Sequence, residues 1–170
     1  MKLIKEYNNF KLDRVMKSLF KNCPKYVFDE FYNADGGMFR KLVSELLDDG
    51  YDIDDIEDHY SDYIDLDWEL KTLELNIDDF SIKTQKNFRK REMGDKHMSF
   101  VPDDENRTKW QRENVIEGDN EPLVMFQHGQ EYELLEGYHR CMALLKKGDN
   151  NSGDYSNWRK VRMKSYVALK

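Results

Sequence analysis

Cysteine and long apolar runs are the features that this sequence has least of. It contains two cysteines, Cys23 and Cys141, among 170 residues, which is too few for a disulfide framework. No apolar run approaches the roughly 20 residues that span a bilayer, and residues 1–6 lack the apolar stretch of a signal peptide. We therefore expect no membrane partner and a location in the cytoplasm of a bacterium or a phage-infected host.

Metal-binding motifs are missing as well. His97 and His128 have no further Cys or His at the spacing of zinc ligands. The acidic residues do not follow the EF-hand pattern, which needs a central glycine and a terminal glutamate. Carboxylates remain as weak candidates for holding a metal ion, with Glu136 first and Glu121 and Glu133 behind it.

The negative charge is concentrated in one region. Residues 1–44 contain nine Lys/Arg and five Asp/Glu, and residues 70–170 contain eighteen Lys/Arg and seventeen Asp/Glu. Residues 45–69 contain twelve Asp/Glu and no Lys/Arg. Three interpretations of residues 45–69 stay open: a solvated helix face, a mimic of DNA phosphates, or a site for divalent cations. Tyr51, Tyr60, Tyr63 and Trp68 in this region indicate that it is folded.

The first half of the chain has the apolar spacing of helices. Leu12, Val15, Met16, Leu19 and Phe20 fall on one helical face. The same spacing and the positions of Pro24 and Gly50 predict three more helices, over residues 24–32, 39–47 and 52–64.

The second half alternates between strand and helix patterns. Leu73, Leu75 and Ile77 alternate with polar residues, and residues 78–102 look charged and irregular. The remaining predicted elements are a helix over 103–115, a hairpin from 123–126 and 132–135, a helix over 138–147 and a strand over 161–169. The fold class predicted is α+β, with a helical N-terminal subdomain over 1–67 and a mixed sheet with flanking helices over 68–170.

The turn at residues 136–140, Glu-Gly-Tyr-His-Arg, is the main candidate site. It joins the second hairpin strand to a helix, and His139 and Arg140 fall in the first helical turn. Cations are unfavourable at that end of a helix, because its dipole already places positive charge there. A bound anion would explain both residues, so we predict a phosphate site.

Each residue of this turn has a structural alternative. Arg140 would clamp phosphate oxygens, or it is a surface residue paired with Glu136. His139 would act as a hydrogen-bond donor or acid, or it caps the helix. Glu136 would be a base or orient Mg²⁺, or it complements the dipole. Gly137 lets an anion approach the backbone, and it also suits a turn with positive φ.

The motif and the order of elements from about Leu70 to Lys170 resemble the ParB/sulfiredoxin-like superfamily. Its members include CTP-binding partition proteins, ATP-using sulfiredoxins, free-serine kinases and ParB-like nucleases. The resemblance implies a nucleotide, ATP or CTP, held with Mg²⁺ at Gly137, Tyr138, His139 and Arg140. It also implies phosphoryl or phosphodiester chemistry: NTP hydrolysis, phosphate transfer or nuclease cleavage. The further nucleotide contacts that it implies come from the helix predicted over 103–115: Thr108, Lys109 and Arg112.

The sequence departs from two branches of that superfamily. Sulfiredoxins carry a reactive cysteine where this chain has Tyr138, and Cys141 falls on the apolar face of the helix as a small buried residue. We therefore expect no sulfinic acid repair. Partition proteins carry a helix-turn-helix domain after this unit, and this sequence ends at Lys170, so we expect no role in DNA segregation.

One basic cluster follows the first predicted strand. Its cations would contact nucleic acid from a mobile loop, or they belong to a solvated loop that pairs with the acidic region. The residues are Lys83, Lys86, Arg89, Lys90 and Arg91.

Two functions from different classes follow. The first is a nucleotide- or phosphate-binding protein with His139, Arg140 and Glu136 as candidate catalytic residues. The second is a non-enzymatic, phage-encoded interaction protein that presents residues 45–69 to a nucleic-acid-binding protein of the host.

Overall fold

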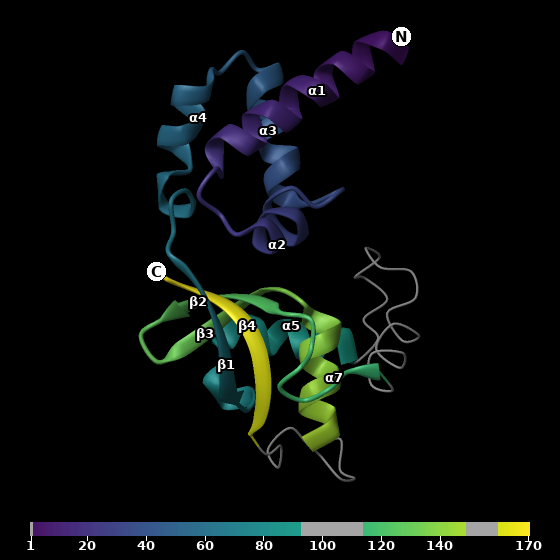
Figure 1. Cartoon of the computed structure of the whole chain (residues 1–170), viewed down its shortest axis with the longest axis vertical. Helices are drawn as coiled ribbons and strands as arrows, with labels where there is room; N and C mark the ends of the chain where they lie inside the picture. The colour runs from purple at the N-terminus through teal and green to yellow at the C-terminus, as the bar shows by residue number, and fades with distance from the viewer. Residues whose placement is uncertain (1, 93–113, 149–159) are drawn as a thin grey trace. The chain divides into compact units, whose positions relative to one another are not determined.

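The computed structural model describes residues 2–92, 114–148 and 160–170 (Figure 1). Within these residues the chain is α+β, as predicted, with six α-helices and one four-stranded mixed sheet. The chain divides into two compact units, Met1–Trp68 and Glu69–Lys170. No helix in the described ranges is long and apolar enough to cross a membrane.

The first unit is a helical bundle whose core follows the predicted spacing. Its helices are α1 (Lys2–Leu19), α2 (Lys25–Val27), a π-helical turn (Phe28–Tyr32), α3 (Met38–Asp48) and α4 (Ile53–His59). The apolar face of α1 is buried, and the rings of Phe20 and Tyr32 stack at 4.0 Å. Phe39 meets both rings edge-on, so aromatic packing holds the end of α1, the π-helical turn and α3 together.

Helix α4 is shorter than the predicted 52–64. It begins with a reciprocal capping box between Asp52 and Asp55, which satisfies two backbone N–H groups. It ends at His59 because the chain tightens into a 3₁₀ turn at Ser61–Tyr63. The Tyr32 hydroxyl donates to the Tyr63 carbonyl oxygen at 2.8 Å. In a continuing helix this oxygen would accept a backbone N–H instead.

The second unit is built on strands in the order β1-β4-β2-β3. The strands are β1 (Trp68–Leu75), β2 (Leu123–His128), β3 (Glu131–Glu136) and β4 (Val161–Leu169). The predicted hairpin and closing strand are confirmed: β2 pairs antiparallel with β3 and parallel with β4. Met125 lies opposite both Leu134 and Val167.

Two helices contribute to the core of the second unit. Helix α7 (Tyr138–Gly148), confirmed at its predicted place, contributes Cys141, Met142 and Leu145. Helix α5 (Ile82–Glu92) contributes Phe88. Both pack with Met125 and other apolar side chains of the sheet, so the turn before α7 is anchored to the core.

The predictions around the first strand need two corrections. The strand begins at Trp68 and ends at Leu75, and Ile77 lies in a 3₁₀ turn, Ile77–Asp79. This turn forms because Asn76 Oδ1 accepts from the Asp78 N–H at 2.9 Å and Asp79 accepts from the Asn76 N–H at 2.8 Å. Side-chain hydrogen bonds of this kind give the backbone an alternative to the hydrogen bonds of a β-sheet, so the strand ends before Ile77.

The second correction is that residues 82–92 are helical and not irregular. Ser81 Oγ accepts from the Thr84 N–H at 3.3 Å, which is an N-cap contact. Thr84 and Phe88, one turn apart, are both fully buried. The segment is therefore a helix that packs through these two residues, although most of its other positions are charged or polar. The helix predicted over 103–115, including Thr108, Lys109 and Arg112, lies outside the described residues except at its last two positions.

Candidate functional site

Gly137 forms the turn between β3 and α7. Its φ of +95° lies in the left-handed region that favours glycine. A Cβ built at this position would lie 2.6 Å from Leu123 Cδ2 and 3.3 Å from Arg140 Nη2. The Gly137 carbonyl oxygen accepts from the Cys141 N–H at 2.8 Å. Glycine is therefore required both by the backbone and by the close approach of Leu123.

A β-bulge precedes this turn. Met125 on β2 is opposite Leu134, and Val124 is opposite Glu136, so Leu135 is the extra residue on β3. A bulge twists the strand and redirects the side chains that follow it. Glu136 is partly buried after the bulge, at the end of the strand that leads into α7.

Arg140 is held in the first turn of α7 by contacts to the segment before β2. Its Nη1 lies 3.0 Å from Glu121 Oε2, and its Nη2 donates to the Pro122 carbonyl oxygen at 3.4 Å. The Arg140 side chain is 12% exposed, and that of Glu121 is 72% exposed. From the sequence, Glu136 is the alternative ion-pair partner of Arg140, and the structure shows Glu121 instead. A nearly buried cation thus faces a solvent-exposed carboxylate at the positive end of a helix.

The Tyr138 side chain turns toward α5. Its hydroxyl donates to the Leu134 carbonyl oxygen at 2.8 Å and accepts from Asn87 Nδ2 at 3.2 Å. Its ring meets Phe88 edge-on at 5.6 Å. A ligand at this turn would therefore meet the backbone of Tyr138 and not its ring.

His139 is partly exposed beside Arg140. The structure thus keeps five of the predicted residues, Glu136 to Arg140, in one bulge–turn–helix segment. The three remaining predicted nucleotide contacts lie outside the described residues: Thr108, Lys109 and Arg112.

The two thiols are protonated at neutral pH. Burial raises the pKa of Cys141, which is fully buried as predicted. Burial also raises the pKa of Cys23 to about 12. Since the thiolate is the nucleophile, neither side chain is poised for covalent catalysis at neutral pH.

Glu133 forms a charged cluster that sequence reasoning missed. Its carboxylate lies 2.5 Å from Lys83 Nζ and 3.4 Å from His128 Nε2. Burial raises the pKa of Glu133, but the hydrogen bonds and charges of Lys83 and His128 outweigh burial and hold it below its ordinary value. The hairpin spacing could have predicted the His128 contact. The Lys83 contact requires the unpredicted α5.

The basic cluster lies on a helix and not on a mobile loop. Four of its cations are exposed on α5: Lys83, Lys86, Arg89 and Lys90. The backbone of Arg91 continues the helix. Phe88, which interrupts the cluster in sequence, is fully buried and does not offer a stacking surface.

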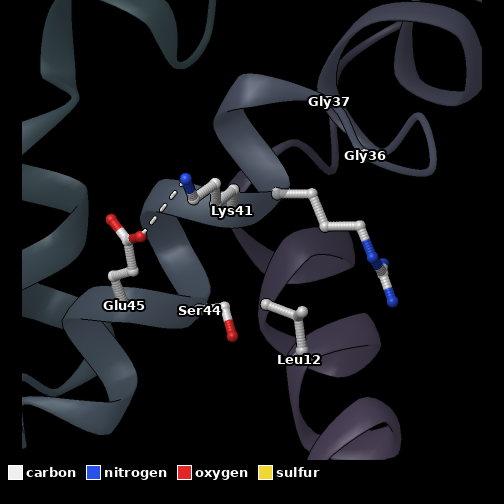
Figure 2. Close-up of a pocket in the computed structure, with 7 residues that line it drawn as sticks. Leu12, Gly36, Gly37, Lys41, Ser44 and Glu45 are labelled. Atoms are coloured by element: carbon white, nitrogen blue, oxygen red, sulfur yellow. Dashed lines mark ion pairs between the residues drawn. The ribbon is translucent and has the colours of Figure 1, made fainter. Parts of the chain in front are cut away.

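The first unit contains a pocket of about 260 Å³ between α1 and α3 (Figure 2). Figure 2 shows Lys41 reaching toward Glu45, and their charged atoms are 3.8 Å apart. Arg40 is bound to Asp13 Oδ1 at 2.7 Å. None of the predicted site residues lines this pocket. Its two cations are paired, so it offers little charge to an anion.

All twelve acidic residues of the region 45–69 are exposed. Within the described residues, no group of three or more His, Cys, Asp or Glu side chains converges in a way that could hold a metal ion. Tyr51 is 51% exposed in the same region. The region is therefore a solvated acidic surface, with a few contacts such as Asn22 to Asp65 at 2.7 Å.

Comparison with known proteins gives no match: no family model, no curated protein and no solved structure is significantly similar to this chain. The resemblance to the ParB/sulfiredoxin-like superfamily therefore stays a prediction.

Proposed function

We propose that this protein binds a phosphorylated ligand, a nucleotide such as ATP or CTP, at the turn between β3 and α7. The observation that carries the proposal is Arg140, which is 12% exposed and held in the first turn of a helix. A cation there opposes the helix dipole. An anion bound between Arg140 and the helix end would interact favourably with the guanidinium and with the positive end of the dipole.

Glu121 supplies that anion while no ligand is bound. Its carboxylate reaches Arg140 from a side chain that is 72% exposed, and exposed ion pairs contribute only about 0.2–1 kcal/mol. A phosphate group would displace Glu121 and keep Arg140 in place. Gly137, which has no Cβ, would let phosphate oxygens come near the backbone, and His139 would donate a further hydrogen bond.

Magnesium would arrive with the nucleotide. The described residues form no cage of three or more metal-binding side chains. Mg²⁺ is commonly held by one or two carboxylates together with substrate phosphates, and Glu136 is the carboxylate at this turn that would hold it. The chemistry that fits is phosphoryl or phosphodiester transfer, in which positioned charges do most of the work. Arg140 would stabilise charge, His139 would act as acid, and Glu136 would act as base or orient the metal.

Isothermal titration with ATP, CTP and GTP, each with and without Mg²⁺, tests this proposal. We expect Arg140→Gln to weaken binding at least ten-fold, because a hydrogen bond to a charged group contributes about 1.5–3 kcal/mol. Arg140→Lys keeps the charge but loses the planar guanidinium, so its nucleotide affinity should lie between those of the wild type and Arg140→Gln. Glu121→Gln removes the competing carboxylate and should tighten binding by up to about five-fold.

Arg162→Gln is the matched control, because Arg162 is exposed on β4 and carries the same charge. Thermal unfolding of each variant shows whether it is folded. The proposal fails if no nucleotide binds, or if folded Arg140→Gln binds as tightly as the Arg162→Gln control.

The acidic surface favours a second function, which is binding to a basic protein. Twelve carboxylates without one Lys or Arg occupy residues 45–69, and all are exposed. Such a surface attracts proteins that bind nucleic acid, because their basic faces are complementary to it. Tyr51, which is partly exposed beside these charges, would add an aromatic contact of the kind enriched in interfaces.

A pull-down from a bacterial lysate tests this second function. One variant neutralises four acids of the surface and spares the capping residues Asp52 and Asp55: Asp48→Asn, Asp54→Asn, Glu57→Gln and Asp58→Asn. The control neutralises four exposed acids of the second unit: Glu74→Gln, Asp78→Asn, Asp119→Asn and Glu131→Gln. We expect basic nucleic-acid-binding proteins to be lost with the first variant and kept with the control. Equal retention by both would refute the idea.

A further inference from the structure

Helix α5 carries its positive charge on one side. At 100° per residue, Lys83, Lys86, Arg89 and Lys90 fall within an arc of about 120°. All four are exposed, whereas Thr84 on the opposite side is buried. We name this set of four cations the basic face of α5. Lys83 to Lys90 spans seven residues, or about 10 Å along the helix.

The stability of α5 does not explain this arrangement. The first turn of α5 contains Lys83 and no acidic residue, although the dipole favours acids there. Lys83 pairs with Glu133 on β3. Within the part of the chain that the structure describes, no carboxylate pairs with Lys86, Arg89 or Lys90. Among the described residues, nothing therefore competes with an external anion for these three cations.

The helix is fixed in place below this face. Thr84 Oγ1 accepts from the Leu134 N–H at 3.0 Å, and Asn87 contacts the Tyr138 hydroxyl at 3.2 Å. Lys83 and Lys90 lie four residues before and three residues after Asn87, so they flank it on the helix surface. The basic face therefore borders the helix surface that contacts the first residue of α7.

We propose that the basic face of α5 binds the phosphate backbone of duplex DNA. Each DNA strand carries one phosphate charge for about every 3.4 Å of its axis, so a row of cations about 10 Å long meets a dense line of negative charge. Single strands are bound by stacking bases on aromatic side chains, and this face has none because Phe88 is fully buried. Contacts of this kind carry no sequence specificity.

The test is fluorescence anisotropy of a labelled duplex of about 20 base pairs, titrated with the full chain at several NaCl concentrations. Three to four phosphate contacts predict that log K falls against log salt with a slope of about −2.7 to −3.6. Replacing Lys86, Arg89 and Lys90 by Gln should flatten the slope by about 2.7 and weaken binding at least ten-fold at 50 mM NaCl. These side chains are exposed, so the fold should survive, which circular dichroism checks.

The matched control changes three exposed lysines of the first unit: Lys11→Gln, Lys17→Gln and Lys21→Gln. It alters the net charge equally and should leave the slope unchanged. The proposal is overturned if the wild type does not bind duplex at 25 mM NaCl, or if the α5 variant and the control show the same slope. It is also overturned if a single strand of equal length binds more tightly, or if the α5 variant changes self-association and not DNA binding.

This proposal and the nucleotide site are separable. Arg140→Gln should weaken nucleotide binding at least ten-fold and leave the duplex slope intact, because Arg140 is not part of the basic face. The triple α5 variant should do the reverse.

Discussion

At Gly137, backbone conformation and packing both exclude a larger residue. A left-handed φ costs a residue with a Cβ about 1–2 kcal/mol, and a Cβ placed 2.6 Å from Leu123 Cδ2 adds an overpacking cost of about 1–3 kcal/mol. We expect Gly137→Ala to lower the free energy of unfolding, measured in urea, by the sum of both. It should also weaken nucleotide binding, because Arg140 Nη2 lies 3.3 Å from the new methyl group.

Gly129 provides the control for that substitution. Its φ is +61°, and a Cβ there meets nothing within 4 Å. Gly129→Ala should therefore show the backbone cost alone. If both variants lose the same stability, the packing argument at Gly137 is wrong.

Glu133 gives a prediction about pH. Its pKa is held below the ordinary value by Lys83 and His128, which outweigh burial. A carboxylate with a lowered pKa stabilises the fold above its unfolded pKa, about 4.3, and this contribution is lost as the pH falls through the folded value. The difference in unfolding free energy between wild type and Glu133→Gln should therefore persist from pH 7 to about 5.

Below that range the difference should shrink toward zero as the carboxylate is protonated. Urea unfolding at a series of pH values measures it, and a size of about 1 kcal/mol or less is expected because Lys83 is exposed. Glu131→Gln, exposed on the same hairpin, serves as the control. A difference that does not shrink as the pH falls below about 4 would contradict the assignment.

Among the elements, α5 protects the edge of the sheet. Strand β3 is last in the order β1-β4-β2-β3, and an uncovered edge strand is prone to pair with other chains. The Ser81 N–H donates to the Tyr132 carbonyl oxygen at 2.9 Å, and Thr84 Oγ1 accepts from the Leu134 N–H at 3.0 Å. The start of α5 thus satisfies backbone groups on the outer side of β3.

Thr84→Val tests that role. Valine matches threonine in shape but leaves the buried Leu134 N–H without its acceptor, which should lower the free energy of unfolding by about 1–3 kcal/mol. Thr84→Ser keeps the hydroxyl and loses one methyl group, which costs about 0.8 kcal/mol. If urea unfolding shows the valine variant to be the more stable of the two, the hydroxyl does not hold the edge.

Local patterns were enough to predict most elements but not α5. The faces of α1 and α7 and the alternation in β4 are read directly from apolar spacing, because burial on one side imposes that period. In α5 only two residues, Thr84 and Phe88, make the buried stripe, and in the sequence they alternate with cations. Ser81 as N-cap was the available signal. The covering of β3, which stabilises the helix, is a tertiary effect that spacing does not reveal.

For the whole molecule, sequence reasoning predicted the α+β class and the bulk of the candidate turn, since Glu136 to Arg140 are contiguous. It could not predict the partner of Arg140, because Glu121 is nineteen residues away and meets it through the start of β2. It also assigned Tyr138 to the ligand without its contacts to Asn87 and Phe88. Partners distant in sequence follow from the assembled sheet and not from local chemistry.

Charge at the scale of the chain bears on both proposals. Residues 45–69 have twelve acids and no bases, whereas residues 70–170 are close to neutral with eighteen bases and seventeen acids. Anionic ligands should therefore be bound through the second unit, where Arg140 and the basic face of α5 lie.

The most direct test of the phosphate site is backbone NMR of the full chain during titration with ATP and Mg²⁺, and separately with inorganic phosphate. We predict the largest amide shifts at Gly137, Tyr138, His139 and Arg140, with saturation that is lost in Arg140→Gln. Shifts concentrated at the pocket residues Gly36, Gly37, Arg40 and Lys41, or no saturable shift at all, would contradict a phosphate site at the turn into α7.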